Sequence, residues 1–177
     1  MRSKSIFLLL TSLLILSACG APQNETTELA AFPADDLENL VQQGKILLDS
    51  DSHDGNGSLS LTVDTSTTIR LYETGDIDIE DAMLVYQASV KSRNLNGMAY
   101  LEMWCVFEDG REFFSRGLNS PWTGDIPWST VQTPFFLKQG QNPVNVRLNL
   151  VVDGSGTVWI DDLRLLRAPL PATHTGS

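Results

Sequence analysis

The chain has 177 residues and a formal net charge of −10 at pH 7. This length suits one domain, and the acidic balance disfavours a nucleic-acid partner because phosphate backbones would be repelled. The sequence contains two cysteines, Cys19 and Cys105, so neither a disulfide framework nor a cysteine-based metal cluster is expected. We expect Cys105 to be a small, buried apolar residue.

The N-terminus has the features of a secretory signal. A positively charged start precedes an apolar run from Ile6 to Leu16, which is shorter than the roughly 20 residues that a membrane-spanning helix needs. The segment Leu16-Ser17-Ala18-Cys19 resembles the bacterial lipobox. This resemblance implies removal of residues 1–18 and attachment of diacylglycerol to the Cys19 thiol. The alternative is an ordinary signal peptide followed by a chance cysteine.

Acylation of Cys19 would make the membrane a partner of the protein through a lipid anchor, since two acyl chains hold a protein stably. The lipobox resemblance implies the bacterial cell envelope. Gly20 stands where an Asp would favour the inner membrane, so the outer membrane is favoured in a Gram-negative cell. Residues 19–36 are polar and contain two prolines, and we expect them to form a flexible tether. The sequence does not indicate an oligomeric state.

The remaining pattern predicts an antiparallel sandwich or barrel. Apolar residues recur at helical spacing over 35–43, which predicts one short helix. Beyond it, alternating apolar segments are separated by turn signals such as Asn94–Gly97 and Asp109-Gly110. The domain would cover residues 37–167, followed by a disordered tail over 168–177. The expected strands are residues 46–49, 59–63, 69–72, 84–90, 99–107, 112–115, 131–137, 144–152 and 158–166.

Four segments carry a family resemblance. They are Asn56–Leu59, Trp128–Thr130, Pro134–Phe136 and Gly154–Leu163. They resemble segments of non-catalytic carbohydrate-binding modules with a galactose-binding-like β-jelly-roll fold, over residues 45–167. The resemblance implies an all-β, single-domain antiparallel β-sandwich and a carbohydrate or glycan ligand. Residues 100–105 depart from the sugar-binding pattern, and a shared fold does not by itself give a shared function.

A sugar-binding groove needs flat aromatic rings for the C–H faces of a sugar and polar side chains for its hydroxyls. Side chains alternate across a sheet, so each strand has an inner and an outer set. The outer sets contain both residue types, and the loop over 117–130 adds a tryptophan. The predicted ligand-binding residues are Arg70, Tyr72, Gln87, Glu102, Trp104, Trp122, Arg147 and Asn149. Alternatively, these residues only pack across strands, with Glu102 neutralising an arginine and Trp122 closing the end of the sandwich.

The resemblance also implies a structural cation. In related jelly rolls a calcium ion often joins the first strand and turn to the last strand, and calcium takes about 6–8 oxygen ligands. The candidate ligands here are Asp49, Asp51, Asp54, Asp161 and Asp162. Residues 51–57 lack the spacing and the terminal glutamate of an EF-hand. The alternative is that these acids are solvated turn residues.

Catalytic function finds little support in the sequence. The two histidines, His53 and His174, stand in no pattern with a serine or cysteine nucleophile. No carboxylate pair is singled out for glycoside hydrolysis. We therefore expect a lipid-anchored, non-catalytic jelly-roll module that binds carbohydrate or glycan at the bacterial cell envelope. The alternatives are a structural or protein-interaction envelope lipoprotein with no small-molecule ligand and, less favoured, a small hydrolase.

Overall fold

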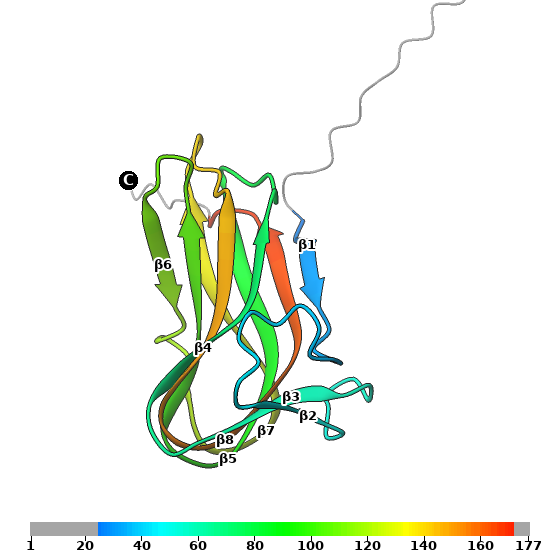
Figure 1. Ribbon diagram of the computed structural model, residues 1–177. Helices are drawn as coiled ribbons and strands as arrows, with labels where there is room; N and C mark the ends of the chain where they lie inside the picture. Colours follow the sequence, from blue (N-terminus) through cyan, green and yellow to red (C-terminus); the bar gives the residue numbers. More distant parts are fainter. Residues whose placement is uncertain (1–24, 172–177) are drawn as a thin grey trace, which may run out of the picture.

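The computed structural model describes residues 25–171, and every helix or strand in this range is a β-strand (Figure 1). No helix in the described part of the chain is long and apolar enough to cross a bilayer. The strands are β1 (Thr27–Phe32), β2 (Ile46–Asp49), β3 (Ser58–Val63), β4 (Thr67–Gly75), β5 (Ala82–Val106), β6 (Glu112–Arg116), β7 (Trp122–Leu137) and β8 (Asn145–Ala168). All strand pairs are antiparallel.

Two long strands organise the fold. β5 and β8 pair with each other from Met83 opposite Ala168 to Val106 opposite Asn145, so nearly the whole of both strands lies in one antiparallel ribbon. The pairing register shifts after Arg93, near the middle of the ribbon. Figure 1 shows that the ribbon bends back on itself in this region. Each long strand therefore contributes one half to each of two facing layers.

We call the two layers the front sheet and the back sheet. The front sheet has the order β4, β8 (145–152), β5 (98–106) and β6. In the back sheet, β1 and β3 lie on one side of β8 (157–168), and β5 (82–92) and β7 lie on the other, with β2 outside β3. This arrangement is the antiparallel β-sandwich that the sequence predicts.

The core lies between the two layers and follows the alternation expected for strands. Leu101, Met103 and Cys105 of β5 point inward from the front sheet, and Leu84 and Tyr86 point inward from the back sheet; all five are at most 1% exposed. Burial raises the pKa of the Cys105 thiol to about 12, so the thiol is protonated at neutral pH. The prediction that Cys105 is a buried apolar residue is confirmed.

Glycine makes the bend of the ribbon possible, because it accepts positive φ and leaves room for a second backbone. Gly97 on β5 has a φ of +113° and lies opposite Gly154 on β8, whose φ is +143°. A Cβ atom on Gly97 would lie 2.1 Å from the carbonyl oxygen of Asp153, and one on Gly154 would lie 2.0 Å from that of Asn96. A side chain at either position would push the two strands apart.

The structure joins segments that the sequence analysis separates. Residues 84–90 and 99–107 fall largely within β5, because the turn signal at Asn94–Gly97 bends the strand instead of reversing it. Residues 144–152 and 158–166 are in the same way parts of β8. Asp109-Gly110 does form the expected hairpin turn between β5 and β6, in which the Phe107 and Arg111 backbones are hydrogen-bonded at 2.9 Å.

The predicted helix over 35–43 is wrong. Asn39 has a φ of +45°, which a right-handed helix does not allow. The backbone N–H of Val41 donates to the carbonyl oxygen of Leu71 at 2.9 Å, and that of Gln42 donates to the carbonyl oxygen of Arg70 at 3.2 Å; both acceptors are in β4. Long-range hydrogen bonds to β4 therefore replace the bonds that a helix would make within the segment.

Part of the segment predicted as a flexible tether is a strand. Residues 27–32 form β1, which pairs with β8 from Thr27 opposite Arg167. β1 adds a strand to the back sheet, so the folded domain begins before residue 37. The signal peptide over 1–18 and the acylation of Cys19 lie outside the described residues and stay predictions, as does disorder over 172–177.

The bend predicts a difference between two glycine substitutions. Gly97→Ala places a Cβ atom on the backbone of β8, and we expect it to lower the free energy of unfolding by at least about 3 kcal/mol. Gly124→Ala is the matched control, because Gly124 also has positive φ, at +66°, but has open space around it. The control should lose only the backbone preference, about 1–2 kcal/mol. Urea unfolding of both variants measures this, and equal losses would contradict the argument.

Candidate functional site

The outer face of the front sheet brings together five of the eight predicted ligand-binding residues. One row across strands β4, β8, β5 and β6 contains Arg70, Asn149, Glu102 and Arg116. The next row, in the same strand order, contains Glu73, Arg147, Trp104 and Phe114. We call these eight residues the polar-aromatic face. The strand adjacency on which the prediction depended is therefore present for this sheet.

Glu102 is the centre of a hydrogen-bond network on this face. Its side chain is 6% exposed. Oε1 accepts hydrogen bonds from Nε1 of Trp104 at 2.8 Å and from Nδ2 of Asn149 at 2.9 Å. Oε2 accepts a hydrogen bond from Nε of Arg116 at 2.6 Å. Each contact fixes the position of a neighbouring side chain, so Glu102 holds three members of the face in place.

The environment of Glu102 stabilises its charged form. Burial alone would raise the pKa of this carboxyl, but the hydrogen bonds from Arg116, Asn149 and Trp104 outweigh burial and lower the pKa below its ordinary value. A buried charge is tolerated when it is paired and hydrogen-bonded, and Glu102 meets both conditions. The carboxylate is therefore ionised at neutral pH.

The other charges on the front sheet are paired as well. Arg147 donates from Nη1 and Nη2 to the two carboxylate oxygens of Glu112, at 3.1 and 3.0 Å. Arg70 donates from Nη1 to Glu73 at 2.8 Å. With the Glu102 ion pair, three arginines are matched by three glutamates. This part of the surface carries no net charge, although the protein as a whole is acidic.

Two aromatic rings lie among these polar groups. The rings of Trp104 and Phe114 are 5.0 Å apart between centroids, and the Arg116 guanidinium lies 4.5 Å from the Phe114 centroid. Phe114 is 48% exposed. Beside them, Oδ1 of the buried Asn149 has no hydrogen-bond partner among the described residues. The face therefore offers accessible ring surface together with hydrogen-bonding groups.

The sequence analysis missed Phe114 and Arg116, which lie on β6. The signal was present in part, because Glu112 and Phe114 alternate along one side of the strand predicted over 112–115, and Arg116 follows that strand directly. What the sequence lacked was the partner of that strand. β6 pairs with β5 so that Phe114 lies opposite Trp104, and only this register makes the two rings neighbours.

The prediction that Tyr72 belongs to the ligand site is wrong. Tyr72 is 5% exposed and stacks on Phe32 of β1, with 4.6 Å between the ring centroids. The register of β4 on β8 shifts between Arg70 and Tyr72, so Leu71 is an extra residue in the strand. The shift turns Tyr72 inward, whereas strict alternation would keep it beside Arg70. Burial raises the pKa of its phenol to about 12, with smaller contributions from nearby aspartates.

Gln87 and Trp122 are also away from the polar-aromatic face. Gln87 lies on the outer side of the back sheet, where its amide donates to Oε1 of Gln132 on β7 at 3.3 Å. Trp122 is 5% exposed, and it lies opposite Ala99 at the start of β7. Trp122 therefore packs as part of the core, in agreement with the alternative reading of this residue.

Two of the five predicted calcium ligands make contacts of another kind. Asp49 accepts a hydrogen bond from Nε1 of Trp159 at 2.8 Å. Asp51 accepts one from Nε1 of Trp128 at 3.1 Å and forms an ion pair with Lys91. The two carboxylates fasten the end of β2 and the loop that follows it to the outer side of the back sheet. They do not approach the other candidate ligands as a cluster within the described residues.

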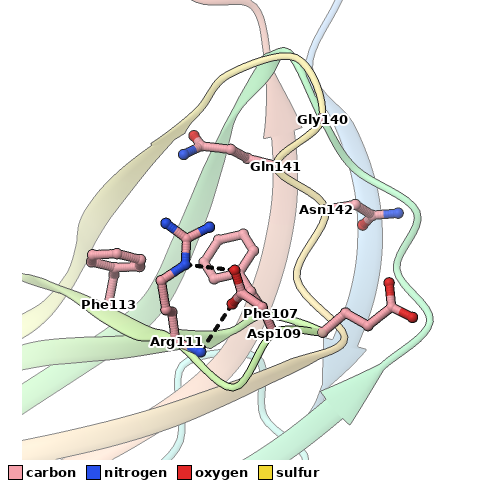
Figure 2. A pocket seen from close by; sticks show the side chains of 8 residues that line it. Phe107, Asp109, Arg111, Phe113, Gly140, Gln141 and Asn142 are labelled. Carbon is pink, nitrogen blue, oxygen red and sulfur yellow. Dashed lines mark hydrogen bonds and ion pairs between the residues drawn. The ribbon is translucent and has the colours of Figure 1, made fainter.

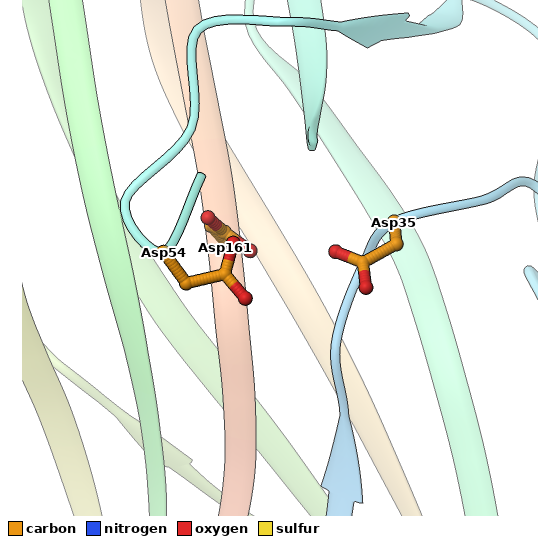
Figure 3. A group of neighbouring side chains, drawn as sticks. All are labelled: Asp35, Asp54 and Asp161. Carbon is orange, nitrogen blue, oxygen red and sulfur yellow. The ribbon is translucent and has the colours of Figure 1, made fainter. Parts of the chain in front are cut away.

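A cluster of three carboxylates does form, with one member that the sequence analysis missed. Oxygen atoms of Asp35, Asp54 and Asp161 lie within 4.8 Å of one another (Figure 3). Asp35 was assigned to the tether, so only the fold shows that it faces the other two. Asp162 is adjacent in sequence, but its carboxylate contacts Nδ1 of His53 at 2.8 Å. The carboxylates come from the loop after β1, the loop after β2 and the last strand.

The donor set of this cluster fits a calcium ion. Asp161 is fully buried, and burial raises the pKa of its carboxyl. Burial and the charges of Asp54 and Asp162 raise the pKa of Asp35. No Lys or Arg within residues 25–171 forms an ion pair with any of the three carboxylates. Carboxylate oxygens are ligands that calcium takes. The two oxygens of Asp161 also accept hydrogen bonds from the backbone N–H groups of His53 at 2.7 Å and Asp162 at 2.8 Å, which hold this carboxylate in place.

The Glu102 network predicts a pH-dependent stability. Because the pKa of Glu102 is lower in the folded chain than in the unfolded chain, its contribution is present above the unfolded value of about 4.3 and is lost as the pH falls through the folded value. We expect Glu102→Gln to lower the free energy of unfolding by about 2 kcal/mol at pH 7. The loss should shrink at pH 3. Denaturant unfolding at both pH values measures it, and a loss of the same size at pH 3 would be the contrary result.

No protein-family model matches this sequence, and no curated protein matches it. Solved structures do share its fold. The CBM22-1 xylan-binding domain of Xyn10C from Paenibacillus barcinonensis has a TM-score of 0.56 and 14% identity, over 84% of this chain and 99% of that chain. The CBM22-1–CBM22-2 tandem domain of the same protein has a TM-score of 0.57 and 14% identity, over 90% of this chain and 50% of that chain.

A third similar structure contains a catalytic module as well. The CBM22-1–GH10 modules of endo-1,4-β-D-xylanase 10B from Clostridium thermocellum, complexed with xylohexaose, have a TM-score of 0.59 and 11% identity. The match covers 85% of this chain and only 30% of that longer chain. At these identities the likeness is one of fold. The protein has the β-jelly-roll sandwich fold of the carbohydrate-binding modules.

Proposed function

We propose that this protein is a non-catalytic module that binds a neutral carbohydrate on the polar-aromatic face, at the bacterial cell envelope. The observation that supports the proposal is the combination of ring surface and balanced, hydrogen-bonded charges in two adjacent rows of one sheet. Trp104 and Phe114 offer apolar surface for the C–H groups of a sugar ring. The partly exposed guanidinium groups of Arg70 and Arg116 offer donors for its hydroxyls.

The charge balance favours a neutral glycan over an acidic one. Each arginine of the front sheet is matched by a glutamate, as described above, so no cation is left to attract a uronate or sulfate group. A neutral sugar can accept hydrogen bonds from the arginines while each arginine keeps its ion pair with a glutamate. The similar modules of known structure include xylan-binding domains, which supports a neutral polysaccharide as the class to test first.

The geometry supports binding more than catalysis. Glycoside hydrolysis requires a carboxylic acid with a raised pKa beside a second, unencumbered carboxylate. On this face the pKa of Glu102 is lowered, and the carboxylates of Glu73 and Glu112 are held by arginines. The lowered pKa of Glu102 does not suit a proton donor at neutral pH. A hydrolase is therefore not the function that we propose.

We also propose that calcium binds between Asp35, Asp54 and Asp161. The ion would join three segments that are far apart in the chain, the loop after β1, the loop after β2 and β8. Its role in this proposal is structural, because it would neutralise the buried carboxylate of Asp161. The cluster lies on the back-sheet side of the molecule and shares no residue with the polar-aromatic face.

The cell-envelope location rests on the leader sequence. The proposed acylation of Cys19 would place the lipid eight residues before Thr27, the first residue of β1. A segment of that length reaches roughly 27 Å when extended. The jelly roll would then remain close to the membrane surface, where it would meet glycans of the envelope.

Removal of one aromatic ring tests the binding face. We expect Trp104→Ala to weaken binding of xylohexaose and soluble xylan about tenfold, which corresponds to about 1.4 kcal/mol, because a stacked ring is lost. Trp128→Ala is the matched control, since Trp128 is half-buried on the outer side of the back sheet. Isothermal titration calorimetry and affinity electrophoresis measure the effect.

Two outcomes would contradict the proposed face. Equal weakening by Trp104→Ala and Trp128→Ala would place the ligand elsewhere. Failure of the unmodified protein to bind xylohexaose, xylan or any neutral glycan on an array would favour the structural or protein-interaction alternative. A thermal melt of each variant shows whether the fold is intact.

Calcium binding predicts a cation-dependent melting temperature. At a calcium concentration 100 times the dissociation constant, the stabilisation is about 2.7 kcal/mol, or roughly 5–10 °C for a domain of this size. We expect this increase over protein in EDTA, and we expect Asp161→Asn to abolish it. Asp64→Asn, at an exposed turn residue outside the cluster, should keep it. An identical melting temperature with calcium and with EDTA would contradict the proposed calcium site.

A further inference from the structure

A pocket of about 430 Å³ lies at the end of the sandwich, outside the polar-aromatic face. It is formed by the hairpin between β5 and β6 and by the loop between β7 and β8 (Figure 2). Its volume is within the range of small-molecule sites, roughly 300–1,000 Å³. The lining residues are Phe107, Glu108, Asp109, Arg111, Phe113, Gly140, Gln141 and Asn142. None of them belongs to the two rows described above.

Two aromatic rings line this pocket. Phe107 and Phe113 meet edge to face, with 5.9 Å between the ring centroids and 71° between the ring planes. Phe113 lies opposite Cys105, on the inward side of β6, so its ring is at the mouth between the layers. It is nevertheless 45% exposed. The pocket therefore presents an aromatic surface that no other described part of the chain covers completely.

Arg111 lies next to these rings and forms an exposed ion pair with Asp109. Its backbone N–H and its Nε both donate to the Asp109 carboxylate, at 3.0 and 2.6 Å. The guanidinium carbon lies 5.9 Å from the Phe113 centroid. In Figure 2 the terminal nitrogens of Arg111 point away from Asp109, toward the side of the pocket where Gln141 lies. Neither terminal nitrogen donates to another residue within the described range, so both are available to a ligand.

The opposite wall is held in a fixed orientation. Oε1 of Gln141 accepts a hydrogen bond from the backbone N–H of Lys138 at 2.8 Å, which leaves its amide NH₂ group as a donor. Oδ1 of Asn142 accepts from the backbone N–H of Ile79 at 3.2 Å. The loop is also fastened by a hydrogen bond from the Gly140 backbone to Glu80. The donors of the pocket are thus positioned before any ligand arrives.

We propose that this pocket is a second carbohydrate site, which takes the terminal one or two rings of a neutral saccharide. Phe113 would contact the C–H face of a ring, and Arg111 and Gln141 would donate to its hydroxyl oxygens. The pocket has one guanidinium and two carboxylates, Glu108 and Asp109, which disfavours an anionic ligand. The pocket lies between two loops and suits a short ligand, whereas the front sheet suits the middle of a long chain.

The test is an NMR titration of the protein with xylobiose and cellobiose, with a galacturonic acid dimer as the anionic comparison. We expect saturable chemical-shift changes at the backbone amides of Gly110, Gly140 and Gln141 with the neutral disaccharides. The acidic dimer should bind more weakly. Arg111→Met and Phe113→Leu should each weaken the neutral disaccharides about tenfold. Phe136→Leu is the matched control, because Phe136 is 54% exposed and does not line the pocket.

The experiment tests the pocket independently of the proposed front-sheet function, because the chemical-shift changes of each site are measured at different residues. Shifts that appear only at Glu102 and Asn149 would support the front sheet and overturn the pocket. A lack of saturable shifts at Gly110, Gly140 and Gln141 with either disaccharide would overturn the pocket whatever the front sheet binds. So would unchanged affinity in both Arg111→Met and Phe113→Leu. A thermal melt of each variant verifies that the fold is retained.

Discussion

The close approach of two backbones at Gly97 and Gly154 is the constraint on which the rest of the molecule depends. At this point the β5/β8 ribbon turns over on itself, and the halves of each strand come to face each other. The core is the space enclosed between those halves. β4 and β6 extend one layer and β1, β3 and β7 extend the other, so the strand neighbours that build each surface follow from this single fold-back.

The front sheet shows how a buried charge can organise a surface. Glu102 would be costly to bury alone, but its three donors satisfy both carboxylate oxygens. In return, the positions of Trp104, Arg116 and Asn149 are fixed in the folded protein. A ligand that meets side chains already in place does not bear the entropic cost of ordering them. The ion pairs that remove net charge from this face also make its geometry rigid.

Much of the fold could be predicted from local pattern. Strand and turn signals depend only on residues that are close in sequence. The strands predicted from the alternation in 59–63 and 144–152 are present, and so is the hairpin predicted from Asp109-Gly110. The predicted helix over 35–43 does not form, because backbone hydrogen bonds to β4 determine the conformation of this segment more strongly than the spacing of a few apolar residues. β1 was missed because it is only six residues long, follows a polar segment and shows no strict alternation, so its strand character depends on the pairing with β8.

The candidate sites were less predictable, because they depend on register and on contacts between distant segments. The extra residue at Leu71 places Tyr72 in the core instead of on the surface. A bulge of this kind cannot be predicted from the composition of the strand. The pairing of Phe114 with Trp104 is set by which strand lies at the sheet edge. Asp35 joined the acidic cluster through the path of the loop after β1. Arg70 and Arg147 were correctly placed because their strands alternate without interruption up to those positions.

The pairing of Thr27 with Arg167 places the first and last strands side by side at the sandwich end that holds the Arg111 pocket. A protein module fused directly before Thr27 or directly after Ala168 would therefore crowd that end and leave the opposite, bent end open to solvent. For the same reason a short peptide could bridge β8 to β1. A circular permutant opened at the exposed turn between β3 and β4 would then keep every strand pair of both sheets.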